Sequence, residues 1–443
     1  TSMKEVQDTQ QEMVARQAEW NLGDALALSG SQQRFFRIPR SLVSLNATTA
    51  QHNSQTFETQ FRQFIGWFPT LCLRFEPTDT GVKQRWVPHQ EVPVEFMYRD
   101  SAKMKQLTST SEFYKPFDLF DGPLIRVLVI TDASDEQRAT VVVHVQHSLL
   151  DAYSAGVIEK RLRAYLNGDT TPFATTTTYF DFVKWQEAFI SSELGMQKRA
   201  FWKEFLKEDV HNSAEKQIPL EVDGFVEQRA LLTSNALQGL QTNAESHQVP
   251  ISAMLFANYL KLLERFKMKE QSVCGVMVDG REQQIPGLDT DGLLGVIDNL
   301  LPLPMRILES GADDNEASIQ SVYSTYLEAR MHQQIPYTVI RSDVKKEFGL
   351  DLDACMAGQF NFQVRPYANT DSNTEEEVTF GAVEHHLMPG IHLNCIAYSN
   401  ALDIRLLYKE SVYKEMEYKP DLKDFLKHLI PSNETLKKQA TPA

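Results

Sequence analysis

The chain of 443 residues is 42% hydrophobic and 23% charged, a composition typical of a globular protein with a sizeable core. At about 100 to 200 residues per domain, this length predicts two or three domains, and we expect two large lobes. The net charge of −15 disfavours non-specific binding to nucleic acid or to anionic lipid. We therefore expect no nucleic-acid partner and no membrane partner.

The cysteines and the lack of long apolar runs bear on the compartment. The four cysteines are far apart, with no CxxC pair, so the sequence predicts neither a zinc knuckle nor a disulfide scaffold. The sequence does not open with a basic segment followed by an apolar stretch, and no run of about 18 apolar residues occurs. These features favour a reducing, cytoplasmic location.

In chain order, a polar N-terminal segment, 1–25, precedes the mixed stretch "LALSGSQQRFF" at 26–36. Residues 54–77 have apolar side chains at helical spacing and then "TLCLRF", which predicts a helix followed by a strand. Two β-rich runs follow, at 114–130 and 139–147, with a polar turn between them. We expect these two runs to be adjacent strands of one sheet.

The pattern becomes helical at Asp151, and the sequence predicts a helix over 152–167. A Thr-rich loop, 168–182, separates it from a helical stretch, 183–208, and we place the lobe boundary here. The first lobe is then 26–182, the linker helix and second lobe 183–430, and a polar tail 431–443. In the second lobe we expect helices at 249–266 and 315–332, a loop at 279–294, and strands at 272–278, 299–307, 358–365, 379–386, 391–398 and 402–408.

One short stretch, "VVVHVQHSLLDAYS" at 141–154, contains the strongest candidate for chemistry. Residue 147 shares a strand face with Val143 and Val145, and it stands where that face meets a turn. A neutral imidazole can accept a proton from an attacking amine or hydroxyl, so His147 is a candidate general base. A histidine at a strand end can equally be structural. Asp151 is a good N-cap for the following helix, and we expect it to brace the turn in either case.

Other candidate sites are weaker. His385, His386 and His392 gather with Glu384, but adjacent histidines on a strand point to opposite faces, so we expect no metal site. The chain contains no GxSxG elbow, no GxxxxGK[ST] loop and no GxGxxG after a strand. The basic run Lys160, Arg161 and Arg163 is either a solvated helix face or a docking site for an acidic partner.

Several segments together resemble the condensation domains of nonribosomal peptide synthetases, which belong to the chloramphenicol-acetyltransferase-like acyltransferase superfamily. "LSGSQQRFF" is similar to an LSxAQxRxW motif, and "YKPFDLFDGPLIRVLVI" to a pFDLxxGPLxR strand. "QHSLLDA" at 146–152 resembles HHxxxDG, and "KWQEAF" through "QKRAFWKEFL" resembles the linker helix. "GVMVDGREQQIPGLDTDGLLGVIDNLLPLPMRI" is similar to GxxxxGR…GxFxNxLPLR, and "FNFQ" to a later strand. The motifs follow the family's order from about residue 26 to 430.

The resemblance implies an α/β (α+β) fold with two chloramphenicol-acetyltransferase-like lobes in a V-shaped pseudo-dimer and the active site at their junction. It implies that His147 is catalytic and that Asp151 is structural. Arg34 and Arg281 are the basic residues placed to pair with Asp151 or to shape the site, and the sequence does not choose between them. Gln146 replaces the family's first histidine, and Ala152 its glycine, which suggests a divergent stand-alone or terminal-type member.

The leading hypothesis is therefore transfer of an acyl group from a phosphopantetheine thioester on a carrier protein to a small-molecule amine or alcohol. His147 would accept the proton, and backbone donors near the turn would polarise the carbonyl. The alternatives are an acyltransferase of the same fold that uses acyl-CoA, and a non-catalytic recruiting domain. We expect no permanently bound cofactor, a monomer, and either a free-standing protein or an excised domain, with Lys160, Arg161 and Arg163 as the candidate carrier-docking residues.

Overall fold

A computed structural model provides the fold. It describes residues 26–36, 42–88, 90–105, 113, 115–175, 177–210, 225–266, 271–283, 285–311, 315–365, 376–383, 390–414 and 416–430, together with positions 4, 8 and 11. The predicted tail 431–443 lies outside these residues, as does most of the predicted segment 1–25. All four cysteines are buried and free, so no disulfide joins them.

The chain forms two compact units. Residues up to Ser192, together with Asp279–Asp298, make the first unit, and Glu193–Val278 with the residues from Asn299 onward make the second. The helix that ends at Ser191 belongs to the first unit, and only the segment 279–298 departs from sequence order. The segment 279–298 leaves the second unit between two paired strands and packs buried apolar residues into the first core.

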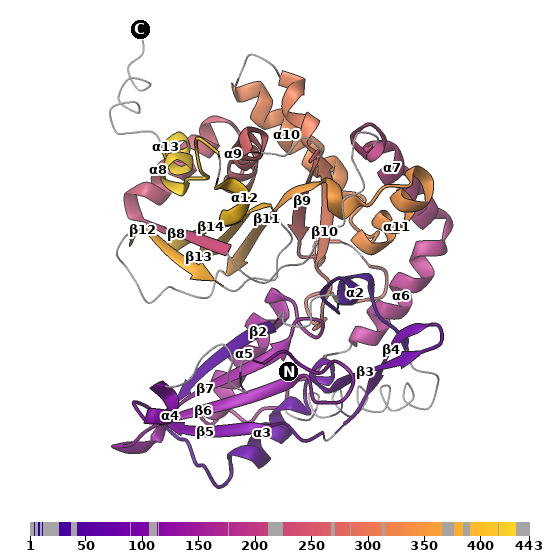
Figure 1. The fold of residues 1–443 in the computed structure, drawn as a ribbon. Helices are drawn as coiled ribbons and strands as arrows, with labels where there is room; N and C mark the ends of the chain where they lie inside the picture. The colour runs from indigo at the N-terminus through magenta and orange to yellow at the C-terminus, as the bar shows by residue number, and fades with distance from the viewer. Residues whose placement is uncertain are drawn as a thin grey trace. The chain divides into compact units, whose positions relative to one another are not determined.

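The first unit contains two sheets within the described residues, in the strand orders β2-β7-β6-β5 and β1-β4-β3 (Figure 1). The predicted neighbours are confirmed, since β6 and β7 pair antiparallel with Val127 opposite Val143. The strands are β1 Leu26–Ala27, β2 Leu42–Thr49, β3 Leu73–Thr78, β4 Gly81–Trp86, β5 Val94–Tyr98, β6 Ile125–Asp132 and β7 Asp135–Gln146; the helices are α2 Gly30–Phe36, α3 Phe57–Ile65, α4 Ala102–Lys105, α5 Ala152–Leu166 and α6 Tyr179–Ser191.

The second unit has a single sheet among its described strands, in the order β10-β9-β11-β13-β14-β8-β12. Only the contacts of β11 with β9 and β13 are parallel, which makes the sheet mixed. The strands are β8 Phe225–Thr233, β9 Val273–Val278, β10 Asn299–Pro304, β11 Met356–Arg365, β12 Glu376–Val383, β13 Ile391–Tyr398 and β14 Ala401–Lys409; the helices are α7 Glu193–Val210, α8 Ser234–Ser246, α9 Ile251–Phe266, α10 Asn315–Arg330, α11 Tyr337–Phe348, α12 Glu410–Tyr413 and α13 Leu422–Leu429.

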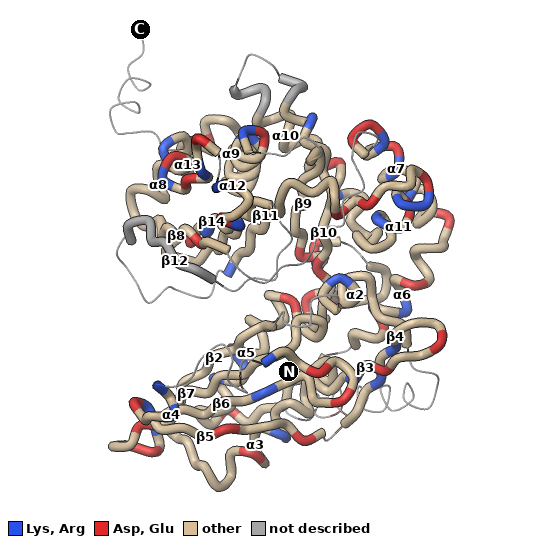
Figure 2. The backbone as a smooth tube through the Cα atoms, in the orientation of Figure 1, with Lys and Arg blue, Asp and Glu red and all other residues tan. Residues whose placement is uncertain are grey.

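The predicted helix 183–208 is two helices. It starts earlier because Thr178 and Asp181 form a capping box, in which the Thr178 side chain accepts from the Asp181 N–H and the Asp181 carboxylate accepts from the Thr178 N–H. The chain then becomes extended at Ser192, with ψ of 164°, before α7 begins. Figure 2 shows both signs of charge on α7 and α11, and Arg199 pairs there with Asp343 at 2.7 Å.

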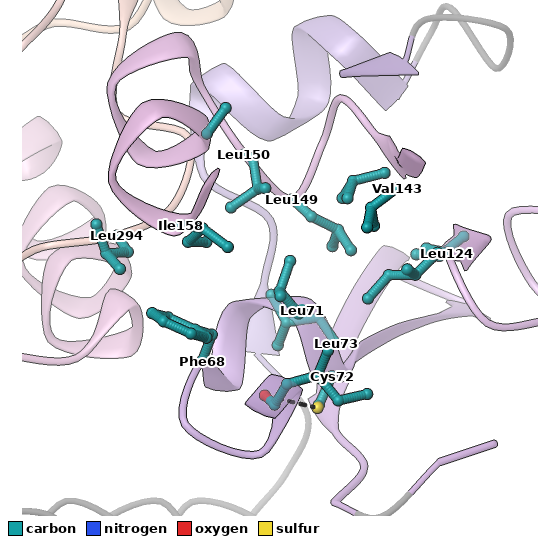
Figure 3. Close-up of a cluster of buried hydrophobic side chains, with 14 of the residues drawn as sticks. Phe68, Leu71, Cys72, Leu73, Leu124, Val143, Leu149, Leu150, Ile158 and Leu294 are labelled. Atoms are coloured by element: carbon teal, nitrogen blue, oxygen red, sulfur yellow. Dashed lines mark hydrogen bonds between the residues drawn. The ribbon is translucent and has the colours of Figure 1, made fainter. Parts of the chain in front are cut away.

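The core of the first unit fixes the segment that follows β7. Leu149 and Leu150, two and three residues after the candidate histidine, are fully buried and join a large apolar cluster. Figure 3 shows these two leucines with Ile158 of α5 and with Leu71 and Leu124. At about 1.5 to 3 kcal/mol for each buried aliphatic side chain, this anchoring holds the turn at the end of β7 in one place.

Candidate functional site

Gln146, the last residue of β7, is folded back onto the turn that follows it. Its backbone N–H donates to the Leu124 carbonyl at 2.9 Å, and its Oε1 accepts from the Ser148 N–H at 2.6 Å. The Leu149 N–H donates to the Gln146 carbonyl at 3.0 Å. Two backbone donors of the turn are therefore already used by Gln146, so they are not the donors expected to polarise a substrate carbonyl.

His147 lies one residue beyond β7 and is only partly exposed. Burial, helped by the Arg34 guanidinium, lowers the pKa of His147 to about 4, while the backbone carbonyls of His147 and Leu150 and the Asp151 carboxylate oppose the shift. Among the described residues, Nδ1 is buried without a hydrogen-bond partner, and none donates to or accepts from Nε2. The ring is thus neutral at pH 7, with Nε2 available to a substrate.

Asp151 is held by four hydrogen bonds. Its Oδ1 accepts from the Ser154 N–H at 2.9 Å, which makes it the predicted N-cap of α5. Arg281 donates from Nη1 to Oδ2 at 2.7 Å and from Nη2 to Oδ1 at 3.2 Å, and the Ile297 N–H donates to Oδ2 at 3.2 Å. Both side chains of the ion pair are buried. Of the two arginines considered, Arg281 is the one that pairs with Asp151.

Ser154 extends this network and was not identified from the sequence. Its Oγ accepts from the Gly295 N–H at 2.9 Å and from Arg281 Nη2 at 3.0 Å, and donates to the Gly295 carbonyl at 3.0 Å. Gly295 has φ of 146°, and a Cβ there would lie 2.1 Å from a ring carbon of Tyr179. The only local signal was the position of Ser154, three residues after the N-cap.

Arg34 pairs with a different carboxylate. Its Nη2 donates to Asp298 Oδ1 at 3.2 Å. Burial raises the pKa of Asp298 to about 6, and the Arg34 guanidinium counteracts part of that rise. The guanidinium carbon also lies 4.4 Å from the ring centre of Phe35, and Phe35 stacks on His147 with ring centroids 3.6 Å apart. Arg34 therefore pairs with Asp298 and contacts Phe35, and it also lowers the pKa of His147 through its charge.

Ala152 is the first residue of α5, and its φ is not positive. The backbone at this position does not need the conformational freedom of glycine, so the replacement of the family's glycine leaves the turn and the helix start intact.

The predicted basic residues separate into two kinds. Lys160 and Arg163 are exposed on α5. Arg161 instead donates to the Thr171 carbonyl at 2.6 Å and lies over the Phe173 ring. Arg163 lines an open hollow with Arg99 and Arg138. The sequence did not indicate this grouping, because Arg99 follows β5 and Arg138 lies in β7, far from Arg163 along the chain. Four of these side chains, Lys160, Arg163, Arg99 and Arg138, are called the basic face below.

The remaining predicted candidates, Glu384, His385, His386 and His392, are described only in part. His385, His386 and Glu384 lie outside the described residues, while His392 is buried in β13 of the second unit. Within the described ranges, no three His, Cys, Asp or Glu side chains could hold a metal ion together. In the same ranges, every helix is too short or too polar to cross a lipid bilayer.

Comparison with known proteins identifies the family. The model of the family described as "Condensation domain" matches residues 43–439. The chain is 24% identical over 326 residues to tyrocidine synthase 3 of Brevibacillus parabrevis, covering 73% of this chain and 5% of that protein. It is 22% identical over 331 residues to gramicidin S synthase 2 of Aneurinibacillus migulanus, covering 71% and 7%. The chain thus spans less than a tenth of the length of these two relatives.

Solved structures share the fold. One, on condensation domain-mediated chain release from the enacyloxin polyketide synthase, matches with a TM-score of 0.68 and 16% identity, covering 95% of this chain and 84% of that one. The epimerization domain from the third module of tyrocidine synthetase B matches with a TM-score of 0.69 and 13% identity, covering 92% and 94%. The expected mixed α/β fold class is confirmed, and the chain belongs to the condensation domain family.

Proposed function

We propose that this chain transfers an acyl group from a phosphopantetheine thioester on a carrier protein to an amine or an alcohol, with His147 as general base. The observation that carries the proposal is the placement of His147, which is partly exposed one residue beyond β7, with its imidazole stacked on Phe35 and its pKa lowered by burial. It stands on a turn anchored by buried leucines on one side and by the Asp151–Arg281 pair on the other.

In the proposed reaction, the acceptor nitrogen or oxygen attacks the thioester carbonyl carbon while His147 Nε2 takes its proton. The tetrahedral intermediate then collapses, the C–S bond breaks, and the thiolate leaves with the proton from the imidazolium. A base with a lowered pKa is a weak proton acceptor, so the reaction depends on close positioning of the acceptor against Nε2. Asp151 has a supporting role, because its oxygens are occupied by α5, Arg281 and Ile297.

The basic face supports the carrier as donor. Carrier domains that meet a chain of net charge −15 need a local positive surface if they are themselves acidic. Lys160 and Arg163 of α5, with Arg99 and Arg138 beside Arg163, offer one. Each arginine is partly neutralised by a neighbouring carboxylate, as in the pairs Arg99–Asp132 at 2.7 Å and Arg163–Glu159 at 3.6 Å. We therefore expect steering and docking of moderate, salt-sensitive strength.

The test is an intact-protein mass assay with an acyl-loaded carrier and a panel of amines and alcohols. Transfer by the wild type and loss of transfer in His147→Ala, with an unchanged thermal midpoint, is the expected result. His144→Gln is the matched control, because His144 is a buried histidine of the same strand whose Nδ1 contacts the Phe113 carbonyl. Near-normal transfer by His147→Ala contradicts the proposed base.

Further arms of the same assay distinguish the alternatives. Transfer from acyl-CoA but not from the loaded carrier supports the CoA-dependent alternative. Stable binding of the loaded carrier without transfer supports a recruiting domain. Because an epimerization domain shares this fold, the acyl group is also recovered and analysed for a change of configuration, since fold alone does not select the reaction.

A further inference from the structure

The imidazole of His147 must be held in one orientation if it is to act as a base. A catalytic histidine is generally held by a hydrogen bond from the ring nitrogen that does not meet the substrate. Here Nδ1 is buried, yet none of the described residues forms a hydrogen bond with it. The backbone carbonyls of His147 and Leu150 favour protonation of the ring and raise its pKa against the effect of burial. A further contact holds the plane of the ring.

That contact is the ring of Phe35. The rings of Phe35 and His147 are nearly parallel, with an interplanar angle of 11° and centroids 3.6 Å apart. Since Phe35 covers one face of the imidazole, rotation of the His147 side chain would require the phenyl ring to move. Phe35 covers a face of the ring and not its edge, which carries Nε2.

Phe35 is itself held from two directions. The Arg34 guanidinium carbon lies 4.4 Å from the Phe35 ring centre, and Arg34 is anchored by its ion pair with Asp298. The Ser31 hydroxyl donates to the Asp298 backbone carbonyl. Asp298 therefore contacts the short helix α2 through both its side chain and its main chain. At the start of α2, the Gly30 N–H donates to Gln186 Oε1 at 2.9 Å. These contacts hold helix α2, and with it Phe35, in a fixed position.

We propose that Phe35 is a positioning residue, whose ring sets the plane of the His147 imidazole, and that the Arg34–Asp298 pair holds the Phe35 ring in place. This inference rests on the proposed function, because a fixed imidazole plane matters only if Nε2 takes a proton. A misplaced base lowers the rate of the chemical step and leaves substrate binding intact.

The experiment compares Phe35→Leu with Phe36→Leu. Phe36 is the neighbouring residue of α2, and its ring contacts Phe75 and Phe120 at 5.3 and 5.7 Å instead of His147. Turnover is measured with the loaded carrier, and the ring protons of His147 are followed by NMR in histidine-labelled protein, assigned by their absence in His147→Ala. A stacked phenyl ring shields these protons, so their NMR signals report the contact between Phe35 and His147. A merely structural role for Phe35 would not require this contact.

We expect Phe35→Leu to remove the shielding and to lower kcat by about 10- to 100-fold at unchanged KM. Phe36→Leu should retain both properties, and Phe35→Tyr should restore both because it keeps the ring. Asp298→Asn, which weakens the anchor of Arg34, should give an intermediate loss of shielding and of kcat. Unchanged shielding or unchanged kcat in Phe35→Leu, with an active wild type, overturns this inference alone. A wild type without turnover, or an active His147→Ala, overturns the proposed function instead.

Discussion

Arg281 and Asp151 meet in a buried ion pair in which two guanidinium nitrogens contact two carboxylate oxygens, at 2.7 and 3.2 Å. Asp151→Asn keeps a side chain that can cap α5 but leaves the guanidinium without its counter-charge. We expect the free energy of unfolding to fall by about 3 to 5 kcal/mol, measured by urea denaturation.

A half-exposed pair of the same unit provides the comparison. Arg85 and Glu76 are 3.0 Å apart, with side chains 39% and 41% exposed. Glu76→Gln should change the free energy of unfolding by no more than about 1 kcal/mol, because solvent screens this pair. Equal losses in the two variants would mean that burial does not set the strength of the Asp151–Arg281 pair.

The activity of the protein should persist in acid. A general base works unprotonated, so the rate falls as pH falls through its pKa. Because burial lowers the pKa of His147 to about 4, the acid limb of kcat/KM should lie near pH 4 and not near the ordinary histidine value of about 6.5. A pH profile of acyl transfer checks this, and an acid limb near pH 6.5 would show that the free protein exposes the ring more than described.

The stability of the fold should weaken over the same range of pH. Burial also lowers the pKa of His144 and of His332 to about 4. Between the ordinary value of about 6.5 and about 4, the unfolded chain binds more protons at these positions than the folded chain does. The contribution to stability is therefore complete above about pH 6.5 and is lost as pH falls toward 4. Urea unfolding at several pH values should show that the free energy of unfolding changes less with pH in His144→Gln than in the wild type.

Two glycines should respond to alanine in opposite directions. Gly295→Ala would place Cβ 2.1 Å from the Tyr179 ring at a φ of 146°, so we expect a marked fall in thermal midpoint. Gly156 lies in α5 with open space around it, and Gly156→Ala should stabilise the protein by about 0.4 to 1 kcal/mol. Thermal melts of the two variants check both signs, and a neutral Gly295→Ala would contradict the close packing of Gly295 against Tyr179.

Charge reversal on the basic face should affect acyl transfer from the carrier protein and not acyl transfer from CoA. Arg163→Glu should lower transfer from the loaded carrier, more strongly at low salt, and leave any transfer from acyl-CoA unchanged. Lys427→Glu makes the same change of charge at an exposed position of α13 and serves as the control. Equal effects of the two substitutions would indicate a response to net charge alone and would remove the basic face from the docking proposal.

The sequence could predict the parts of the site whose causes are local. The strand, the turn and the N-cap at Asp151 all follow from residues within one short stretch, so alternation and capping preferences were sufficient. Local sequence patterns could not predict the pairing of Arg281 with Asp151 or the stacking of Phe35 on His147. Arg281 is 130 residues from Asp151, and Phe35 lies in a separate helix. The early start of α6 was readable in principle, since Thr178 and Asp181 have capping-box spacing.

The path of residues 279–298 has a consequence for exchanging parts between condensation domains. This segment is joined at both ends to paired strands of the second unit, yet it supplies Arg281 to Asp151 and the Leu293, Leu294 and Ile297 side chains to the first core. A chimera with a single junction near Ser192 would therefore draw Asp151 and Arg281 from different parents. Engineered hybrids need three crossover points, so that this inserted segment travels with the N-terminal sequence whose buried carboxylate it neutralises.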